Sequence, residues 1–134
     1  MGKVIYEAFF VQDDLESKLS NDVEYKHITT EFRPSETHEH LYGKMATFNV
    51  YAYGNDNNNE GYAVKMISCD DNELWEIYNR VDIPHLTLST SAEGKPINTV
   101  KLEFDFIDNF TITTKFGGFI GRPIFEEVWY DNKW

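Results

Sequence analysis

The chain has 134 residues, which suits one domain with a single sizeable core, and 16% of the residues are aromatic. Asp and Glu number 23 against 12 Lys and Arg, so the formal net charge is −11. This acidity disfavours a protein that coats duplex nucleic acid, because phosphate binding of that kind needs a basic face, and it leaves open a small nucleotide or an RNA end in a local pocket.

The first third of the chain predicts a strand, a helix and a second strand. Residues 3–11 are rich in Val, Ile, Tyr and Phe and predict a strand that is buried on both faces. Aspartates that can cap a helix, followed by leucines on one helical face, predict a short helix over residues 13–20. Residues 23–32 predict the next strand, which Pro34 ends.

The polar stretch at residues 35–40 is turn-like and predicts a surface loop. It contains His38 and His40, which form a His-x-His pair of the kind that can bind a metal. No third ligand follows at a recognisable spacing. We therefore expect no metal site and no cofactor.

Residues 45–53 alternate apolar and polar side chains and predict a strand with one apolar face. Residues 54–61 carry glycine at both ends and predict a hairpin turn into a return strand over residues 62–67. A second helix is predicted over residues 72–80, where aspartates provide the cap and apolar residues recur at helical spacing.

The last part of the chain predicts strands at residues 85–89, 102–106, 110–116 and 124–130, with a turn at Asp108-Asn109 and a frayed tail at residues 131–134. The expected fold is thus one α+β domain over residues 1–134, with mainly antiparallel sheets and two helices. Each expected helix precedes a strand of similar sequence, which predicts a bilobal domain with pseudo-twofold symmetry.

Those two similar strands share a four-residue phrase. Residues 27–30 read His-Ile-Thr-Thr and residues 85–88 read His-Leu-Thr-Leu. Alternate side chains of a strand point to the same face, so each phrase presents an imidazole and a hydroxyl on one side and apolar or β-branched groups on the other. If the two strands lie side by side, two histidines and two threonines converge on one cleft.

That set of side chains suits phosphoryl chemistry without a metal. His27 and His85 can serve as base and acid on opposite sides of a phosphorus atom, because imidazole titrates near the working pH. The hydroxyls of Thr29 and Thr87 are neutral donors that can bind the non-bridging oxygens. The residues alone do not decide which histidine is the base.

The two phrases resemble the paired His-x-Thr motifs of the 2H phosphoesterase superfamily, and the order of helices and strands resembles its bilobal fold. Residues 85–90, with Gly94-Lys95-Pro96, further resemble the cyclic phosphodiesterase module of fungal-type tRNA ligases and related RNA-repair proteins. The resemblance implies hydrolysis of a 2′,3′-cyclic phosphate or a related phosphodiester by the four residues His27, Thr29, His85 and Thr87.

Phage members of the same superfamily, which destroy cyclic oligonucleotide immune signals (anti-CBASS nucleases), are similar in kind. A non-catalytic nucleotide-binding module is a third interpretation, and a plain structural domain with widely separated histidines is a fourth. The natural substrate, the 2′- or 3′-phosphate product and the oligomeric state are not determined by the sequence.

Further residues are candidates for binding substrate, namely Lys95, Tyr6 and either Phe116 or Phe119. Lys95, in the loop after the second phrase, can neutralise a phosphate. Tyr6 in the first strand can stack on a base, as can Phe116 or Phe119. Aromatic residues at such positions more often belong to the core.

The remaining features indicate a cytoplasmic protein (host cytoplasm if phage-encoded). The single cysteine, Cys69, cannot form an internal disulfide, which favours a reducing compartment. The N-terminal apolar run contains an acid and lacks a small-residue cleavage site, so we expect no signal peptide. No apolar run approaches the roughly 20 residues of a membrane span, so we expect no membrane partner.

Overall fold

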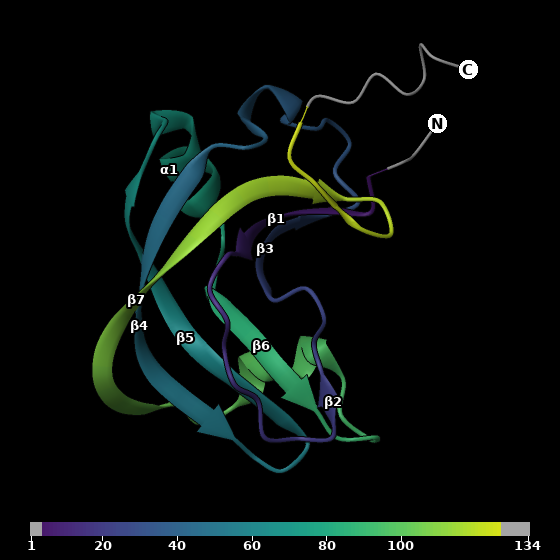
Figure 1. Cartoon of the computed structure of the whole chain (residues 1–134), viewed down its shortest axis with the longest axis vertical. Coiled ribbons are helices and arrows are strands. Elements are labelled where there is room, and N and C mark those ends of the chain that lie inside the picture. The colour runs from purple at the N-terminus through teal and green to yellow at the C-terminus, as the bar shows by residue number, and fades with distance from the viewer. Residues whose placement is uncertain (1–3, 127–134) are drawn as a thin grey trace.

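An eight-stranded sheet forms the body of the molecule in the computed structural model, which describes residues 4–126. The sheet order is β2-β6-β5-β4-β7-β1-β3, β8 pairs with β7, and the described pairs are antiparallel (Figure 1). The strands are β1 (Tyr6–Val11), β2 (Asn21–Asp22), β3 (His27–Phe32), β4 (Met45–Asn55), β5 (Asn59–Cys69), β6 (His85–Thr90), β7 (Asp105–Phe119) and β8 (Pro123–Ile124). The helical segments are α1 (Asn72–Tyr78) and the 3-10 turns η1 (Glu39–Leu41) and η2 (Pro96–Lys101). This arrangement confirms the predicted α+β class with a mainly antiparallel sheet.

The helix predicted over residues 13–20 is wrong, because the residues after Asp13 form an irregular connection. Two backbone amides of this connection donate to side chains that are distant in sequence. The amide of Lys18 donates to Glu60 Oε1 at 2.8 Å, and that of Leu19 donates to Ser89 Oγ at 3.2 Å. An isolated helix of this length is marginal in water, so tertiary hydrogen bonds decide the local conformation.

The second predicted helix is confirmed as α1. The side chain of Asp71 caps it by accepting a hydrogen bond from the amide of Glu73 at 2.9 Å. Leu74 and Ile77 are buried on the face that contacts the sheet. The helix therefore has the cap and the apolar stripe that its sequence predicts.

The turn predicted at Asp108-Asn109 is wrong, because β7 runs through it as one long strand. β7 pairs with β4 on one side and with β1 on the other. An irregularity in the register, where Val50 faces Phe110 and Ala52 faces Phe106, absorbs the extra residues. The last predicted strand, residues 124–130, overlaps β8 (Pro123–Ile124) only at Ile124 within the described residues, and residues 127–134 lie outside the described part of the chain.

The hairpin between β4 and β5 is tighter than predicted. The side chain of Asp56 accepts hydrogen bonds from the amides of Asn58 and Asn59, and Asn57 has a φ of 70°. Asn59 and Glu60 belong to β5 and are only 1% exposed, so they are interior residues.

The two strands that carry the His-x-Thr phrases occupy matching places in the sheet. β4 and β7 pair with each other, and the order runs outward from β7 through β1 to β3 and from β4 through β5 to β6. Each phrase strand is thus the second strand beyond the central pair. On the β6 side the order continues to the two-residue β2.

The residue pairing beside the two phrases matches as well. The pairs are Phe10–His27 and Ala8–Thr29 in β1 and β3, and Ala63–His85 and Gly61–Thr87 in β5 and β6. The register then shifts after Glu7 in β1 and after Glu60 in β5. Both irregularities fall directly beside the threonine of the phrase, where they increase the local twist.

The glutamate at each irregularity is buried and fully hydrogen-bonded. Glu7 accepts from the backbone amide of His38 at 2.7 Å, from its ring Nδ1 at 2.8 Å and from the Tyr42 hydroxyl at 2.8 Å. Glu60 accepts from the amide of Lys18, from the Ser89 hydroxyl at 2.7 Å and from the Tyr53 hydroxyl at 2.5 Å. A buried carboxyl group without such partners would be strongly destabilising.

The hydrophobic core is formed by buried side chains of the sheet and includes Phe116, which is 0% exposed. Its ring packs 5.3 Å from the ring of Phe9 and 5.8 Å from the ring of Tyr42. The prediction that Phe116 binds substrate is therefore wrong, because no part of its ring reaches the surface.

We expect Phe116→Ala to lower the free energy of unfolding by about 3–5 kcal/mol, because it removes a buried ring and leaves a cavity. Phe106→Ala is the matched control, since Phe106 is 87% exposed and its replacement should change stability by less than about 1 kcal/mol. Urea unfolding followed by circular dichroism measures both. Equal effects of the two substitutions would contradict this assignment of the core.

Candidate active site

The strands β3 and β6 come together although they share no backbone ladder in the described sheet. Cα atoms of the two strands approach within 8 Å. Figure 1 shows the sheet curving so that β3, in the upper half, lies near the beginning of β6, in the lower half. The two strands that carry the phrases therefore approach each other without pairing.

The predicted alternation of faces is also present in both phrases. Ile28 and Leu86 are 0% exposed and belong to the core. The flanking histidines and threonines are half-buried or exposed, so they lie on the opposite face. In each phrase the aliphatic side chain packs in the core, and the imidazole and the hydroxyl lie on the face away from the core.

The two imidazoles are held in the same way. His27 Nδ1 lies 2.6 Å from the carbonyl oxygen of Tyr25, and His85 Nδ1 lies 2.8 Å from the carbonyl oxygen of Ile83. A carbonyl oxygen only accepts, so Nδ1–H is the donor in each bond. In its neutral form each ring then carries its basic lone pair on Nε2, and the bond to the residue two positions earlier fixes the orientation of the ring.

The environment of His27 favours its neutral form. Burial lowers the pKa of His27 below its ordinary 6.5, the bond to the Tyr25 carbonyl opposes this shift, and the positive charge of His85 lowers the pKa further. The last cause places the charge of His85 within electrostatic range of the His27 ring.

The two threonines differ in their surroundings. Thr29 is exposed, and its hydroxyl has no hydrogen-bond partner within residues 4–126. The hydroxyl of Thr87 lies 2.7 Å from Thr99 Oγ1 and 3.2 Å from the carbonyl oxygen of Pro96. The sequence gives no signal for Thr99, because it is one of several polar residues in a short turn.

Tyr6 lies against His27 at the beginning of the first phrase. The two rings stack with centroids 4.7 Å apart, and the hydroxyl oxygen of Tyr6 is 3.4 Å from His27 Nδ1. Burial raises the pKa of Tyr6 to about 12, so it is a neutral phenol near pH 7. The ring of Phe119 also stacks on Tyr6, with centroids 4.8 Å apart. The ring centroid of Tyr25 lies 6.0 Å from that of Phe119. Contact of Tyr6 with substrate stays a prediction.

Lys95 is exposed at the beginning of η2, one residue before the proline whose carbonyl accepts from Thr87. Its backbone oxygen accepts from the side chain of Asn59 at 2.6 Å. The residue is thus near the second phrase, and its role in phosphate binding stays a prediction.

The two histidines of the His-x-His pair bond to different carboxyl groups. His38 bonds to Glu7, whereas His40 Nε2 bonds to both carboxyl oxygens of Glu73 at 3.0 Å. Among residues 4–126, no group of three or more histidine, cysteine, aspartate or glutamate side chains could hold a metal ion.

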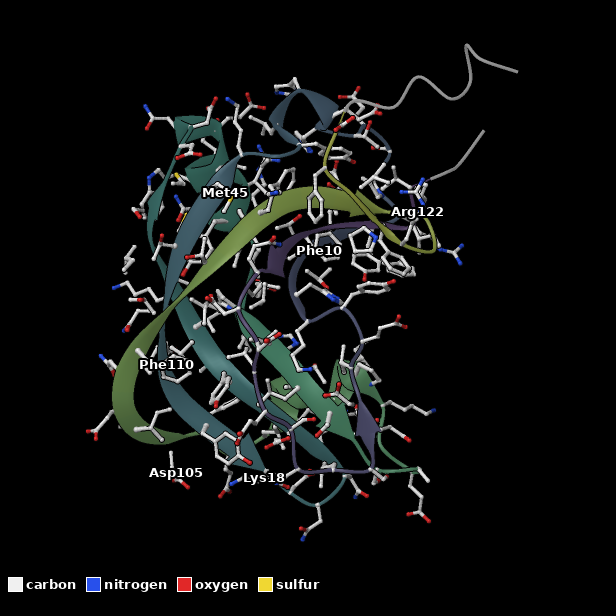
Figure 2. The ribbon with its side chains drawn as sticks, viewed as in Figure 1. Phe10, Lys18, Met45, Asp105, Phe110 and Arg122 are labelled. Carbon is white, nitrogen blue, oxygen red and sulfur yellow. The ribbon has the colours of Figure 1, made fainter. Side chains whose placement is uncertain are left out.

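An open cleft of about 770 Å³ lies beside this region, and it contains none of the four phrase residues. Tyr25 and Lys26, which immediately precede His27, line it together with Phe10 and Arg122. Figure 2 labels Phe10 in β1 and Arg122 in the turn after β7. Four aspartates and glutamates also line the cleft, namely Asp13, Asp14, Asp22 and Glu24.

A comparison with protein-family models finds no match to this chain, and a comparison with curated proteins also finds none. In the described part of the chain, no helix has the length and apolar character that a membrane crossing requires.

We expect His27 to titrate below pH 6.5 in the folded protein. The unfolded chain then binds more protons than the folded one between the two pKa values. The stability due to His27 is therefore fully present above pH 6.5 and is lost as the pH falls through the folded pKa. An NMR titration of the ring protons, assigned with His27→Gln, measures the pKa. A midpoint at or above 6.5 would contradict the burial of this imidazole.

Proposed function

We propose that this protein is a 2H-type phosphodiesterase that hydrolyses a 2′,3′-cyclic phosphate or a related phosphodiester of a nucleotide or RNA end without a metal. The observation that carries the proposal is the equivalent presentation of His27 and His85. Each begins its strand, each donates Nδ1–H to the carbonyl two residues earlier, and each has a threonine two residues later.

The matching registers support a pseudo-twofold 2H fold. The order outward from the β4–β7 pair is the same on both sides, and a buried glutamate and an irregularity lie beside each threonine. This support comes from strand pairing and not from helices, because α1 precedes β6 whereas residues 4–26 contain no helix before β3. Two equivalent strands brought edge to edge would place the two imidazoles on either side of one phosphate.

The geometry suggests which histidine acts first. The lowered pKa of His27 keeps it neutral near pH 7, so we assign it as the base that takes a proton from water. The water oxygen forms a bond to phosphorus, and the bond from phosphorus to the 2′ or 3′ oxygen breaks. His85, in its protonated form, donates a proton to that leaving oxygen. The hydroxyls of Thr29 and Thr87 donate to the non-bridging oxygens, which carry the developing charge.

The charge of the chain guides the choice of substrate. A protein with net charge −11 repels long polyanions, so a small nucleotide or a strand end suits it better than a duplex. Cyclic oligonucleotides satisfy the same condition, and their degradation in a host cytoplasm is the alternative substrate assignment. Exposed Lys95 beside the second phrase would supply a local positive charge.

We expect the purified protein to hydrolyse at least one member of a panel in the presence of EDTA. The panel contains 2′,3′-cyclic nucleotides, RNA with a 2′,3′-cyclic phosphate end, and cyclic di- and trinucleotides. His27→Gln and His85→Gln should each lower kcat by at least about 100-fold, because each removes a proton transfer. Chromatographic separation of the products measures the activity.

His40→Gln is the matched control, since His40 is an exposed histidine that bonds to Glu73 and should leave kcat unchanged. Loss of activity on adding EDTA would contradict the metal-free mechanism. Recovery of every nucleotide unchanged, with binding retained, would favour a non-catalytic nucleotide-binding module.

A further inference from the structure

A chain of side-chain hydrogen bonds leads to Thr87 from the interior. Asn59 Nδ2 donates to Thr99 Oγ1 at 3.1 Å, and Thr99 Oγ1 lies 2.7 Å from Thr87 Oγ1. Asn59 is 1% exposed and Thr99 is 0% exposed, whereas Thr87 is half-buried on the face that it shares with His85. Two buried groups thus support one hydroxyl of the proposed site.

The number of hydrogens on these groups determines which group donates in each hydrogen bond. Thr99 has one hydroxyl hydrogen and already accepts from Asn59. If Thr87 donated to Thr99, the hydrogen of Thr99 would be buried without an acceptor among its bonds in residues 4–126. An unpaired buried donor is unfavourable by about 1–3 kcal/mol. The favoured direction is therefore from Asn59 to Thr99 and from Thr99 to Thr87.

Thr87 then keeps its own hydrogen for another acceptor. In the structure that acceptor is the carbonyl oxygen of Pro96, at a longer 3.2 Å. A phosphoryl oxygen on the open side can take its place. Because a hydroxyl that accepts a hydrogen bond becomes a stronger donor, the chain makes Thr87 a better ligand for negative charge.

The packing around Thr99 holds it close to β5. Gly61 lies opposite Thr87 in the register, and a Cβ added there would lie 2.5 Å from Thr99 Cγ2 and 2.6 Å from the carbonyl oxygen of Leu86. A Cβ at Gly94 would overlap the carbonyl oxygen of Asn58. Both glycines therefore permit the segment that contains η2 to approach the strand.

We propose that Thr99 and Asn59 are positioning residues that orient the Thr87 hydroxyl toward a non-bridging oxygen of the substrate and strengthen it as a donor. This inference rests on the proposed phosphodiesterase function. It makes the two phrases unequal, because Thr29 has no such support among the described residues. The His85–Thr87 half provides the more rigid oxygen-binding subsite.

The test uses Thr99→Val, which keeps the shape of the side chain and removes its hydroxyl. We expect kcat on the best substrate of the panel to fall about tenfold with little change in KM, the effect of one neutral hydrogen bond that matters most in the transition state. Thr99→Ser should restore most of the activity. In a Thr87→Ala background, Thr99→Val should have little further effect, because the two residues act through one hydroxyl.

Binding of adenosine 2′-monophosphate, followed by NMR, gives a readout without turnover, and Thr99→Val should weaken it only when Thr87 is present. If Thr99→Val does not fold, as thermal unfolding would show, Thr99→Ala replaces it in both measurements. Equal losses with and without Thr87, or unchanged kcat and binding, would overturn the inference and leave the proposed function standing. A wild-type protein that neither binds nor cleaves any member of the panel would overturn both.

Discussion

The carboxyl group of Glu60 joins three parts of the chain that are far apart in sequence. It lies in β5 and accepts hydrogen bonds from the amide of Lys18, the hydroxyl of Ser89 and the hydroxyl of Tyr53. Because it is buried, each partner is needed to compensate for lost hydration. These bonds connect the segment between β1 and β3 to β6. The beginning of β3, which contains His27, follows this segment and lies near β6.

The same principle operates in the other half through Glu7, with different partners. Glu7 binds His38 and Tyr42, which follow β3 in the chain, so it fixes the far end of the first phrase strand. Each glutamate stands where the strand register shifts. Two similar strand pairs are thus pinned at corresponding points by unlike networks. The two imidazoles make the same bond to the carbonyl two residues earlier, while the surroundings of the phrases differ.

Those differences give the two halves separate tasks in the proposed reaction. Around His27 the neighbours are aromatic, with Tyr6 stacked on the imidazole and Phe119 behind it. Around Thr87 the neighbours are polar and buried, with Thr99 and Asn59 in a directed chain. Burial among rings favours a neutral imidazole, whereas a polar network favours a hydroxyl that holds negative charge.

Local pattern was sufficient to predict the strands β1, β3, β4, β5 and β6, the helix α1 and the inward and outward faces of both phrases. These features depend on the alternation of side chains and on a nearby capping residue, which are properties of a few adjacent residues. The choice of His27, Thr29, His85 and Thr87 followed from the same alternation. Tyr6 lies beside His27, and stacking of its ring on a base stays a prediction.

Tertiary structure decided the rest. The predicted helix at residues 13–20 does not form, because Lys18 and Leu19 bond to β5 and β6. The predicted turn in β7 does not form, because β4 pairs with β7 on both sides of Asp108-Asn109 and the irregularity in their register takes up the residues between Phe106 and Phe110. Phe116 is a core residue and Thr99 bonds to Thr87 for the same reason: contacts between residues distant in sequence determine burial and partners, and the sequence pattern around a single residue does not contain them.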